Sequence, residues 1–402
     1  MTPMEDTVTD YRPPAPPALT RRQRLQRGVR HSKRHVDRQA LVGAVVAILM
    51  VGVLRVAGAA SEPVAVPPDD GAVFSATMVG DIMPARHTQD ATAKHGRGHP
   101  FENVRPYLTA SDYVTGNFES PVVVGEDYPE ADKFIHFASA PAAVRALREA
   151  NFSTVTLANN HMMDYGEQGL ADTLTTFQDE GVEVVGAGRD LQSASKILYQ
   201  EYGDVTVATL GFTDAYVAGF LASGFRGGVL NAEPETFLPL VVEAAENADL
   251  VIVHVHWGVE YSSRPDPRQV QFGRAMIDAG ANFVVGHHPH VLLPAEVYRN
   301  GVIFYSLGNF VFDQGWSRTR ESAMAGYRLY PDGRARVELV PLWIRDAQPR
   351  PVTGLLGAYR RARIFRQLTK RDPGNAWQRS GDRLTVELDH TTVIQGASRG
   401  GT

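Results

Sequence analysis

The chain has 402 residues, a formal net charge of −5, 43% hydrophobic and 21% charged residues, and no cysteine. This composition is that of a packed globular protein, and the lack of cysteine excludes disulfides, zinc–thiolate sites and iron–sulfur clusters. Residues 1–39 contain nine basic and four acidic residues, whereas 61–402 contain 30 basic and 41 acidic ones. An acidic main domain argues against nucleic acid as a partner, because binding phosphates requires a basic face.

The N-terminal sequence predicts a membrane anchor. Residues 1–39 are expected to form a disordered, basic tail in the cytoplasm. Residues 40–54 are an uninterrupted apolar run, and a helix counted to residue 60 reaches about 31 Å, with Arg55 extending toward the membrane surface. The positive-inside rule then places 61–402 outside the cell. We expect a single-pass protein of the cell membrane; a cleaved signal peptide and a soluble helix are the alternatives.

Beyond a Pro-rich linker at 61–72, β-branched runs alternate with helix-patterned segments. This alternation is typical of an α/β fold with a parallel or mixed sheet. The predicted strands are 73–79, 113–115, 154–157, 205–210, 250–255, 283–285 and 302–305. The predicted helices are 141–149, 169–180, 234–247 and 267–279, and three of them begin at a proline, which suits the first helical turn.

The pattern changes after residue 309. Residues 323–330 and 334–342 predict a hairpin with a turn at 331–333. Residues 354–370 predict a basic amphipathic helix, whose polar face either is solvated or contacts a membrane surface. We therefore expect a main domain over 73–345, followed at 346–402 by a helix, a short hairpin and a tail.

Polar clusters follow most of the predicted strands. They are Gly80-Asp81-Ile82-Met83, Gly116-Asn117-Phe118-Glu119, Asn159-Asn160-His161, His254-Val255-His256 and Gly286-His287-His288-Pro289-His290. In open α/β sheets, ligands bind at the carboxyl ends of the strands. Imidazole, amide and carboxylate groups from separate strand ends are what a divalent metal needs. A single histidine of this kind is usually structural, but the ordered set predicts a metal site.

These motifs, with Tyr305-Ser306-Leu307-Gly308-Asn309-Phe310, resemble the bacterial capsule-synthesis CapA family. These are the poly-γ-glutamate biosynthesis proteins, PGA_cap, and the resemblance covers about 73–345. That family is similar in turn to calcineurin-like metallophosphoesterases, which have a dimetal site at the strand ends. The resemblance therefore implies an α/β two-sheet sandwich flanked by helices, of the metallophosphoesterase-like kind.

The resemblance also implies roles for the matched residues. His161 is the implied general acid, and the implied ligands of one or two divalent ions (Mn, Fe, Zn or Mg) are Asp81, Glu119, Asn160, His256, His288 and His290. Residues expected behind the ligands or at the substrate are Asn117, Asp164, His254, Glu260, His287, Arg86 and Asn309. Two positions depart from the phosphoesterase pattern: Met83 stands where a histidine is usual, and Glu119 stands where an aspartate is usual.

The resemblance and the anchor together favour a role in the synthesis or export of an anionic surface polymer, poly-γ-glutamate or capsule. The expected site is a metal-dependent, hydrolase-like one, and the expected partners are the membrane and other capsule-synthesis membrane proteins. One alternative is a cell-surface phosphoesterase or nucleotidase, with a base stacked by aromatic residues among Trp257, Tyr261, Phe310 and Phe312. Another is a non-catalytic polymer-binding assembly factor, with a basic groove from Arg86, Arg264 and Arg268.

Overall fold

The computed structural model describes residues 18–33, 36–59, 71–315 and 318–397. The chain divides into two compact units, 1–61 and 62–402. Most of the linker predicted at 61–72, the first 17 residues of the tail predicted to be disordered, and the last five residues lie outside the described residues.

The first unit contains a helix where the sequence led us to expect disorder. Helix α1 spans Arg21–Lys33. Thr20 N–H donates to Gln23 Oε1 (2.9 Å) and Gln23 N–H donates to Thr20 Oγ1 (3.3 Å), which is a capping box, and the arginines and glutamines that follow are good helix formers. Helix α2 spans Val36–Ala59. Among the described residues no helix is both long and apolar enough to cross a membrane, and the span expected at 40–60 stays a prediction.

The second unit contains two large β-sheets. The larger has ten strands in the order β17-β18-β15-β14-β1-β2-β3-β4, with β13 beside β1 and β16 beside β15. Its strands are β1 (Phe74–Ile82), β2 (Tyr113–Phe118), β3 (Thr154–Thr156), β4 (Glu183–Val185), β13 (Asn309–Val311), β14 (Glu321–Leu329), β15 (Arg334–Arg345), β16 (Gln348–Pro351), β17 (Gln378–Ser380) and β18 (Arg383–Asp389).

The smaller sheet has six strands in the order β11-β12-β10-β9-β7-β6. They are β6 (Leu198–Tyr202), β7 (Val205–Thr213), β9 (Leu250–His256), β10 (Phe283–His287), β11 (Ala295–Tyr298) and β12 (Gly301–Phe304). Strands β5 (Ala187–Gly188) and β8 (Gly228–Val229) form a separate two-stranded ladder. The helices of this unit are α3 (His87–His95), η1 (His99–Phe101), α4 (Arg105–Leu108), α5 (Ala142–Glu149), α6 (Gly166–Glu180), α7 (Leu191–Ala194), α8 (Pro234–Asn247), α9 (Pro267–Asp278), α10 (Gly354–Leu368), η2 (Thr369–Arg371) and α11 (Thr391–Ala397).

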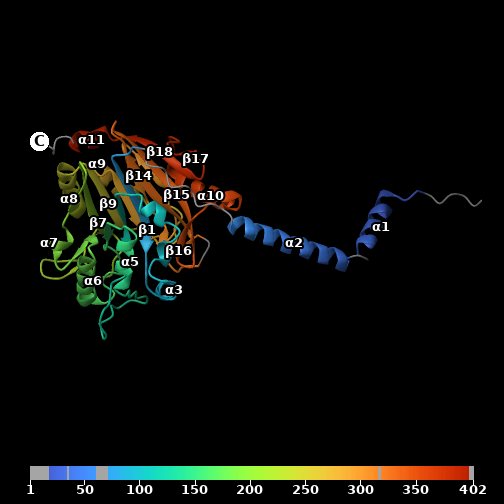
Figure 1. The fold of residues 1–402 in the computed structure, drawn as a ribbon, viewed down its shortest axis with the longest axis horizontal. Helices are drawn as coiled ribbons and strands as arrows, with labels where there is room; N and C mark the ends of the chain where they lie inside the picture. Colours follow the sequence, from blue (N-terminus) through green and yellow to red (C-terminus); the bar gives the residue numbers. More distant parts are fainter. Residues whose placement is uncertain (1–17, 34–35, 60–70, 316–317, 398–402) are drawn as a thin grey trace, which may run out of the picture. The chain divides into compact units, whose positions relative to one another are not determined.

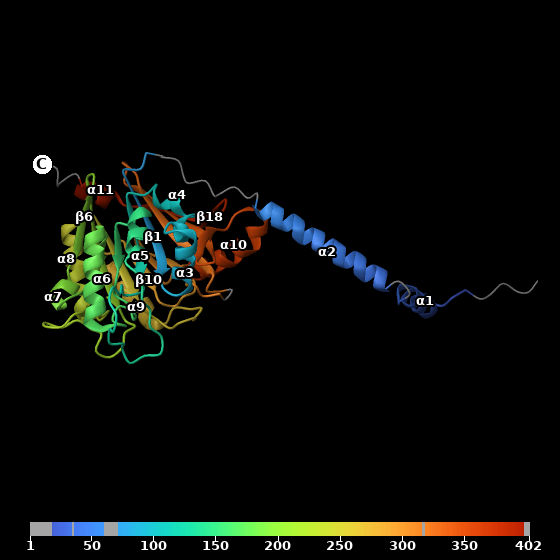
Figure 2. The ribbon, with the colours of Figure 1, turned by 60° about the horizontal axis from the view of Figure 1, so that its bottom comes forward.

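The two sheets pack face to face, with helices on their outer faces (Figures 1 and 2). Met78 of β1 and Ile252 of β9 belong to one apolar core between the sheets. Helices α5 and α6 pack on the outer face of the larger sheet, and α8 and α9 on that of the smaller. The prediction of a mixed α/β fold with flanking helices is confirmed.

The predicted strands from 73 to 305, the four predicted helices and the 323–342 hairpin are all present, with ends shifted by a few residues. The strands that the sequence pattern missed are mostly short, such as β4, β5, β8 and β13, because two or three residues cannot show an alternating pattern. Strand β18 pairs with β15, so the larger sheet continues past the boundary expected at residue 345.

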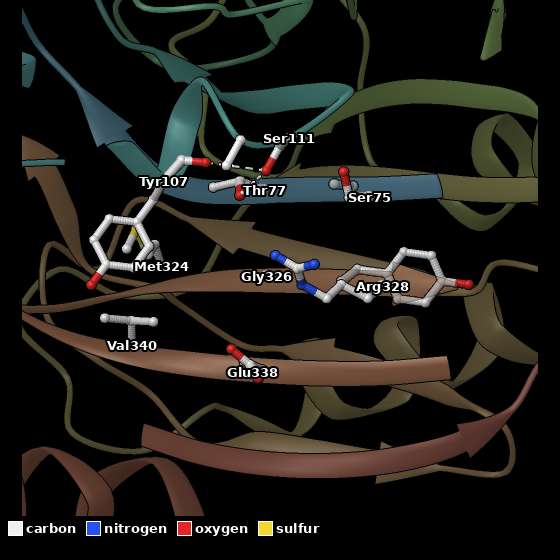
Figure 3. Close-up of a pocket in the computed structure, with 12 residues that line it drawn as sticks. Ser75, Thr77, Tyr107, Ser111, Met324, Gly326, Arg328, Glu338 and Val340 are labelled. Atoms are coloured by element: carbon white, nitrogen blue, oxygen red, sulfur yellow. Dashed lines mark hydrogen bonds between the residues drawn. The ribbon is translucent and has the colours of Figure 1, made fainter. Parts of the chain in front are cut away.

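A narrow hollow lies beside residues 75–77 of β1, between α4 and strands β14 and β15 (Figure 3). Thr77 and Ser111 share a hydrogen bond there (2.8 Å between hydroxyl oxygens), and Glu338 lies on β15, with β14 between it and β1. Its volume is about 40 Å³, which admits water but is far below the size of an ordinary ligand pocket. The hollow is also away from the carboxyl end of β1, where the first polar cluster lies.

Candidate metal centre

On three strands the inward-facing side chains change from apolar in the core to polar at the carboxyl end of the strand. Alternate residues of a strand face the same side. The inward residues are Tyr113, Thr115 and Asn117 on β2, Ile252, His254 and His256 on β9, and Phe283, Val285 and His287 on β10. Strand β2 runs parallel to β1, and β10 runs parallel to β9, so in each sheet the carboxyl ends lie at one edge. The Thr115 hydroxyl lies 2.8 Å from His254 Nε2, which brings the two polar edges together.

Asp81 reaches this edge through an irregularity in β1. The pairing of β1 with β2 shifts register between Met78 and Asp81. Asp81 N–H donates to the carbonyl oxygen of Gly308 (3.1 Å). A Cβ atom on Gly80 would lie 1.8 Å from that same oxygen, so the close approach of the two backbones requires glycine at this position. The side chain of Asp81 is fully buried.

His288 and His290 lie on the turn that follows β10. Both have positive φ angles, 92° and 56°, in a region that L-residues rarely adopt. His288 N–H donates to Asp81 Oδ2 (3.3 Å), and His290 Nδ1 lies 3.0 Å from Asn309 Oδ1. Strained backbone persists only where its surroundings hold it, as they do here, and it commonly occurs at functional sites. The turn brings His290 Nε2 to 3.7 Å from Glu119 Oε1.

Two groups of candidate ligands share Glu119. One consists of Glu119, His288 and His290, and the other of Asp81, Glu119 and His256. Within each group the possible ligand atoms lie within 4.8 Å of one another. Asn160 joins them, with Oδ1 2.9 Å from His256 Nε2. All six residues that the family resemblance implied as ligands therefore lie together, and Glu119 has the position of a bridging carboxylate.

The donor chemistry of this cluster fits a divalent ion. Glu119 Oε1 and His288 Nδ1 are buried and have no hydrogen-bond partner within the described ranges of the chain. Burial and the charge of Asp81 raise the pKa of Glu119 well above its ordinary value. Burial also acts to raise the pKa of Asp81, but hydrogen bonds with His287 and His290 hold it well below its ordinary value. A cation would satisfy the unpaired atoms and offset the repulsion between the carboxylates. Imidazole with carboxylate and amide oxygen suits Mn, Fe and Zn, and the oxygen ligands also suit Mg.

The two carboxylates are positioned by side chains behind them. Asn117 Nδ2 lies 2.9 Å from Asp81 Oδ1 and 3.2 Å from Glu119 Oε2. His254 Nδ1 lies 3.0 Å from His287 Nε2, and His287 Nδ1 lies 3.2 Å from Asp81 Oδ1. The predicted supporting residues Asn117, His254 and His287 thus form a buried layer behind the ligands. Such a layer orients ligands and tunes their affinity for a metal.

His161 lies beside the cluster and is held in one orientation. Its Nδ1 lies 2.8 Å from Asp164 Oδ2, and its ring stacks on Phe137 with centroids 3.9 Å apart. Lys133 Nζ donates to Asp164 Oδ1 (2.5 Å) and to the Asn160 carbonyl oxygen (2.8 Å). Burial lowers the pKa of His161 to about 4, although the Asp164 carboxylate opposes the shift. Because Nδ1 is occupied by Asp164, Nε2 is the nitrogen available to exchange a proton with a substrate.

Sequence reasoning missed Lys133. A single lysine in a polar stretch between strands looks like any surface lysine, so no pattern could have identified it. Only the folded loop that precedes α5 brings its ammonium group to Asp164 and Asn160.

Comparison with known proteins supplies the family. The family model described as "Bacterial capsule synthesis protein PGA_cap" matches residues 75–314. The "PGA biosynthesis protein CapA" of Bacillus subtilis (strain 168) is 44% identical over 379 residues, which cover 94% of this chain and 98% of that relative. The chain belongs to the PGA_cap family. The "Capsule biosynthesis protein CapA" of Bacillus anthracis is 47% identical to this PGA_cap chain over 326 residues, 79% of each.

Solved structures similar to this PGA_cap chain include a phosphoesterase and a nucleotidase. The "calcineurin-like phosphoesterase YfkN from Bacillus subtilis" has 14% identity and a TM-score of 0.35, covering 81% of this chain and 96% of its own. The "5'-nucleotidase from Candida albicans SC5314" has 12% identity and a TM-score of 0.35, covering 65% of this chain and 48% of its own. Scores this low establish neither a shared fold nor a shared activity.

The two positions that depart from the phosphoesterase pattern, Met83 and Glu119, have different environments in this PGA_cap chain. Met83 is fully buried and packs in one apolar cluster with Phe137 and Phe312, and Phe137 in turn stacks on the ring of His161. An apolar contact therefore occupies the position where a histidine ligand is usual. Glu119, by contrast, lies at the centre of the cluster.

The remaining candidates lie around this cluster or outside it. Arg86 pairs with Asp313 (2.5 Å) and lies over the Phe137 ring, 4.6 Å from its centroid, so it lies beside the support of His161. Arg268 is neutralised by Asp214 and Glu233, and Arg264 and Glu260 are exposed. Asn309 Nδ2 donates to the Thr319 carbonyl oxygen (3.2 Å), which fixes the amide that contacts His290.

Three of the four aromatic residues considered for base stacking are core residues. Trp257, Phe310 and Phe312 are each at most 1% exposed. Their rings are therefore not available to stack a nucleotide base. Tyr261 is partly exposed and bonds to Gln314 through its hydroxyl.

Proposed function

We propose that this protein acts in the synthesis or export of an anionic surface polymer, poly-γ-glutamate or capsule, and that its strand-end cluster is a divalent-metal site with hydrolase-like chemistry. The observation that carries the proposal is the convergence of six donor residues, five of them in the two groups that share Glu119; buried atoms of Glu119 and His288 have no hydrogen-bond partner among the described residues. The printed names of two relatives, "PGA biosynthesis" and "Capsule biosynthesis", supply the polymer class.

The residues of the cluster would act either as metal ligands or as a proton donor. Asp81, Glu119, Asn160, His256, His288 and His290 would hold one or two ions. When bound, such an ion lowers the pKa of a coordinated water and stabilises charge at an attacked phosphoryl or acyl centre. His161, oriented by Asp164 and covered on one face by Phe137, would donate a proton to the leaving group through Nε2 in its protonated form, which burial disfavours and the Asp164 carboxylate favours. Lys133 would keep the Asp164 carboxylate in place during that transfer.

Metal analysis of the full-length protein tests the site. We expect near-stoichiometric metal in the wild type, and reduced metal in His256→Ala and His288→Ala. His87→Ala, an exposed histidine on α3, is the matched control and should keep its metal. A protein that takes up no metal after incubation with Mn²⁺ or Zn²⁺ would refute the metal site.

Measurements of substrate turnover distinguish a polymer-acting hydrolase from a surface phosphoesterase and from a non-catalytic assembly factor. The loaded protein would be offered amide-linked and phosphoester substrates, with His161→Ala expected to lose hydrolysis while retaining metal. Hydrolysis of phosphoesters alone would instead favour a surface phosphoesterase. Bound metal without turnover on either class would favour a non-catalytic, polymer-binding assembly factor.

We also propose that residues 40–60 anchor the protein in the cell membrane, with 1–39 in the cytoplasm and 61–402 outside, beside other capsule-synthesis membrane proteins. The support is the sequence alone: nine basic residues precede an apolar run. Protease added to intact protoplasts should digest the main domain, and carbonate extraction should leave the protein with the membranes. Recovery of full-length protein in the soluble fraction would contradict the anchor.

A further inference from the structure

A second concave surface lies next to the turn that carries the histidine ligands. This surface, called here the α10 groove, is lined by the cationic side chains of Arg318, Arg363, Arg366 and Lys370, together with Glu321 and Leu292. Its volume is about 200 Å³. Leu292 follows His290 by two residues, so one end of the groove adjoins the metal centre in the chain.

The α10 groove has excess positive charge. Arg363 is engaged by Glu321, with Nε 3.1 Å from Oε1 and Nη2 3.2 Å from Oε2. Arg318 and Arg366 are exposed and form no ion pair within the described part of the chain, and Lys370 contacts only the neutral amide of Gln367 there. Residues 61–402 contain 30 basic and 41 acidic residues, so four cations around one carboxylate oppose the average charge of the domain. Such a local field concentrates anionic ligands.

Three of the four cations lie in a row on one face of the segment formed by α10 and η2. Arg363, Arg366 and Lys370 follow one another at spacings of three and four along α10 and η2, which places them on one helix face. Gln367 Nε2 donates to the carbonyl oxygens of Leu292 (2.8 Å) and Ser263 (3.0 Å). These bonds fix the row beside the turn that carries His288 and His290. A ligand bound along the row would have one end close to that turn.

We propose that the α10 groove binds a chain of carboxylates separated by short aliphatic spacers and presents it to the metal centre, an inference that rests on the proposed function. Three of the four cations are arginines, whose planar guanidinium matches a carboxylate with two parallel hydrogen bonds. Val291 and Leu292 supply apolar surface for the methylene spacers. This groove replaces the one expected from Arg86, Arg264 and Arg268, two of which are neutralised by acidic neighbours.

The test is the binding of a labelled γ-linked glutamate decamer to the full-length protein, with metal removed by chelator. Arg366→Glu/Lys370→Glu should weaken binding about tenfold or more, because each reversal replaces an attraction by a repulsion. The control Lys94→Glu/Lys196→Glu makes the same charge change at two exposed lysines outside the groove and should weaken binding by less than about twofold. Equal weakening in both double variants would overturn the proposal.

Two further arms complete the test. A polyphosphate of matched charge should bind more weakly than the glutamate decamer; equal or tighter binding would overturn the carboxylate assignment. Arg366→Gln, which removes one charge with little change of shape, should give an intermediate loss even if the double variant fails to fold. Because binding is measured without metal, failure of the metal site would leave this result intact, and failure of the groove would leave the metal analysis intact.

Discussion

Asp81 is held from behind by a histidine that is not itself grouped with the ligands. His287 Nδ1 lies 3.2 Å from Asp81 Oδ1, and His287 Nε2 lies 3.0 Å from His254 Nδ1. All three side chains are buried. Groups behind a ligand set its orientation, so His287 should control metal affinity without touching the ion.

His287→Phe should therefore lower metal affinity about 10–100-fold, the range found when groups behind a ligand are removed. Competition against a chelating dye measures the change. The control is His390→Phe, a buried histidine bonded to Tyr327 (2.8 Å), which should cost stability but leave metal affinity unchanged. Equal affinities for the His287 variant and the wild type would show that His287 does not position Asp81.

Asp164→Asn should reduce hydrolysis roughly 100-fold or more while the metal content stays at the wild-type level. The carboxylate that orients His161 and stabilises its protonated form would be lost. Lys133→Met should give a smaller reduction, because the lysine acts only through Asp164 and Asn160. Asp179→Asn, at an exposed position on α6, is the matched control. A parallel loss of metal and activity in Asp164→Asn would instead place Asp164 among the residues that hold the ion.

The sequence located most of this cluster for a physical reason. A polar motif after a buried strand must lie at the edge of the sheet, so Asp81, Asn117 and His256 could be placed near one another before the structure was known. Their assignment as ligands came from the family resemblance. Lys133 could not be found this way, because it comes from a loop whose path depends on tertiary contacts.

At the scale of elements, the close approach of β1 to the segment before β13 positions Asp81, the first of the implied ligands in the chain. Gly80 approaches Gly308 so closely that no side chain fits between them. The pairing of β1 shifts register on both sides of Asp81, between Met78 and Asp81 against β2 and between Asp81 and Ile82 against β13. The β-branched run at 73–79 predicted the strand but contained no sign of this close approach.

Gly80→Ala should destabilise the protein by about 1–3 kcal/mol, since its Cβ would lie 1.8 Å from a backbone oxygen and the strands would have to separate. Urea unfolding measures the loss. Gly326→Ala on β14 is the matched control, because the nearest atom to its Cβ is 4.0 Å away; it should be neutral or stabilising by about 0.5 kcal/mol. Equal effects of the two substitutions would contradict a close crossing at Gly80.

At the scale of the whole molecule, the cluster joins the two sheets. Asp81 belongs to β1 of the larger sheet, and His256 belongs to β9 of the smaller. An ion bound to both would hold the faces of the sandwich together. The alternation of strand-like and helix-like segments predicted a parallel or mixed α/β fold. The two-sheet sandwich was expected only from the family resemblance, because the sequence pattern does not show how strands divide between sheets or which sheets pack together.

Chelation should therefore lower the melting temperature by a few degrees, since a ligand present at 100 times its dissociation constant stabilises the folded state by about 2.7 kcal/mol. Adding back Mn²⁺ or Zn²⁺ should restore it. Asp81→Asn should show no response to the chelator. A melting temperature unaffected by chelation in the wild type would mean that no ion links the sheets.

The position of β1 has a consequence for how the protein is made. This early strand lies inside the larger sheet and pairs with β14 from Phe74↔Leu329 to Met78↔Ala325. Asp81 likewise meets His288, 207 residues further along the chain. During translation, β1 can meet β2 on one side early, but its other side must wait for β14 until the ribosome has made about four-fifths of the chain. The larger sheet is thus completed only after this late segment emerges.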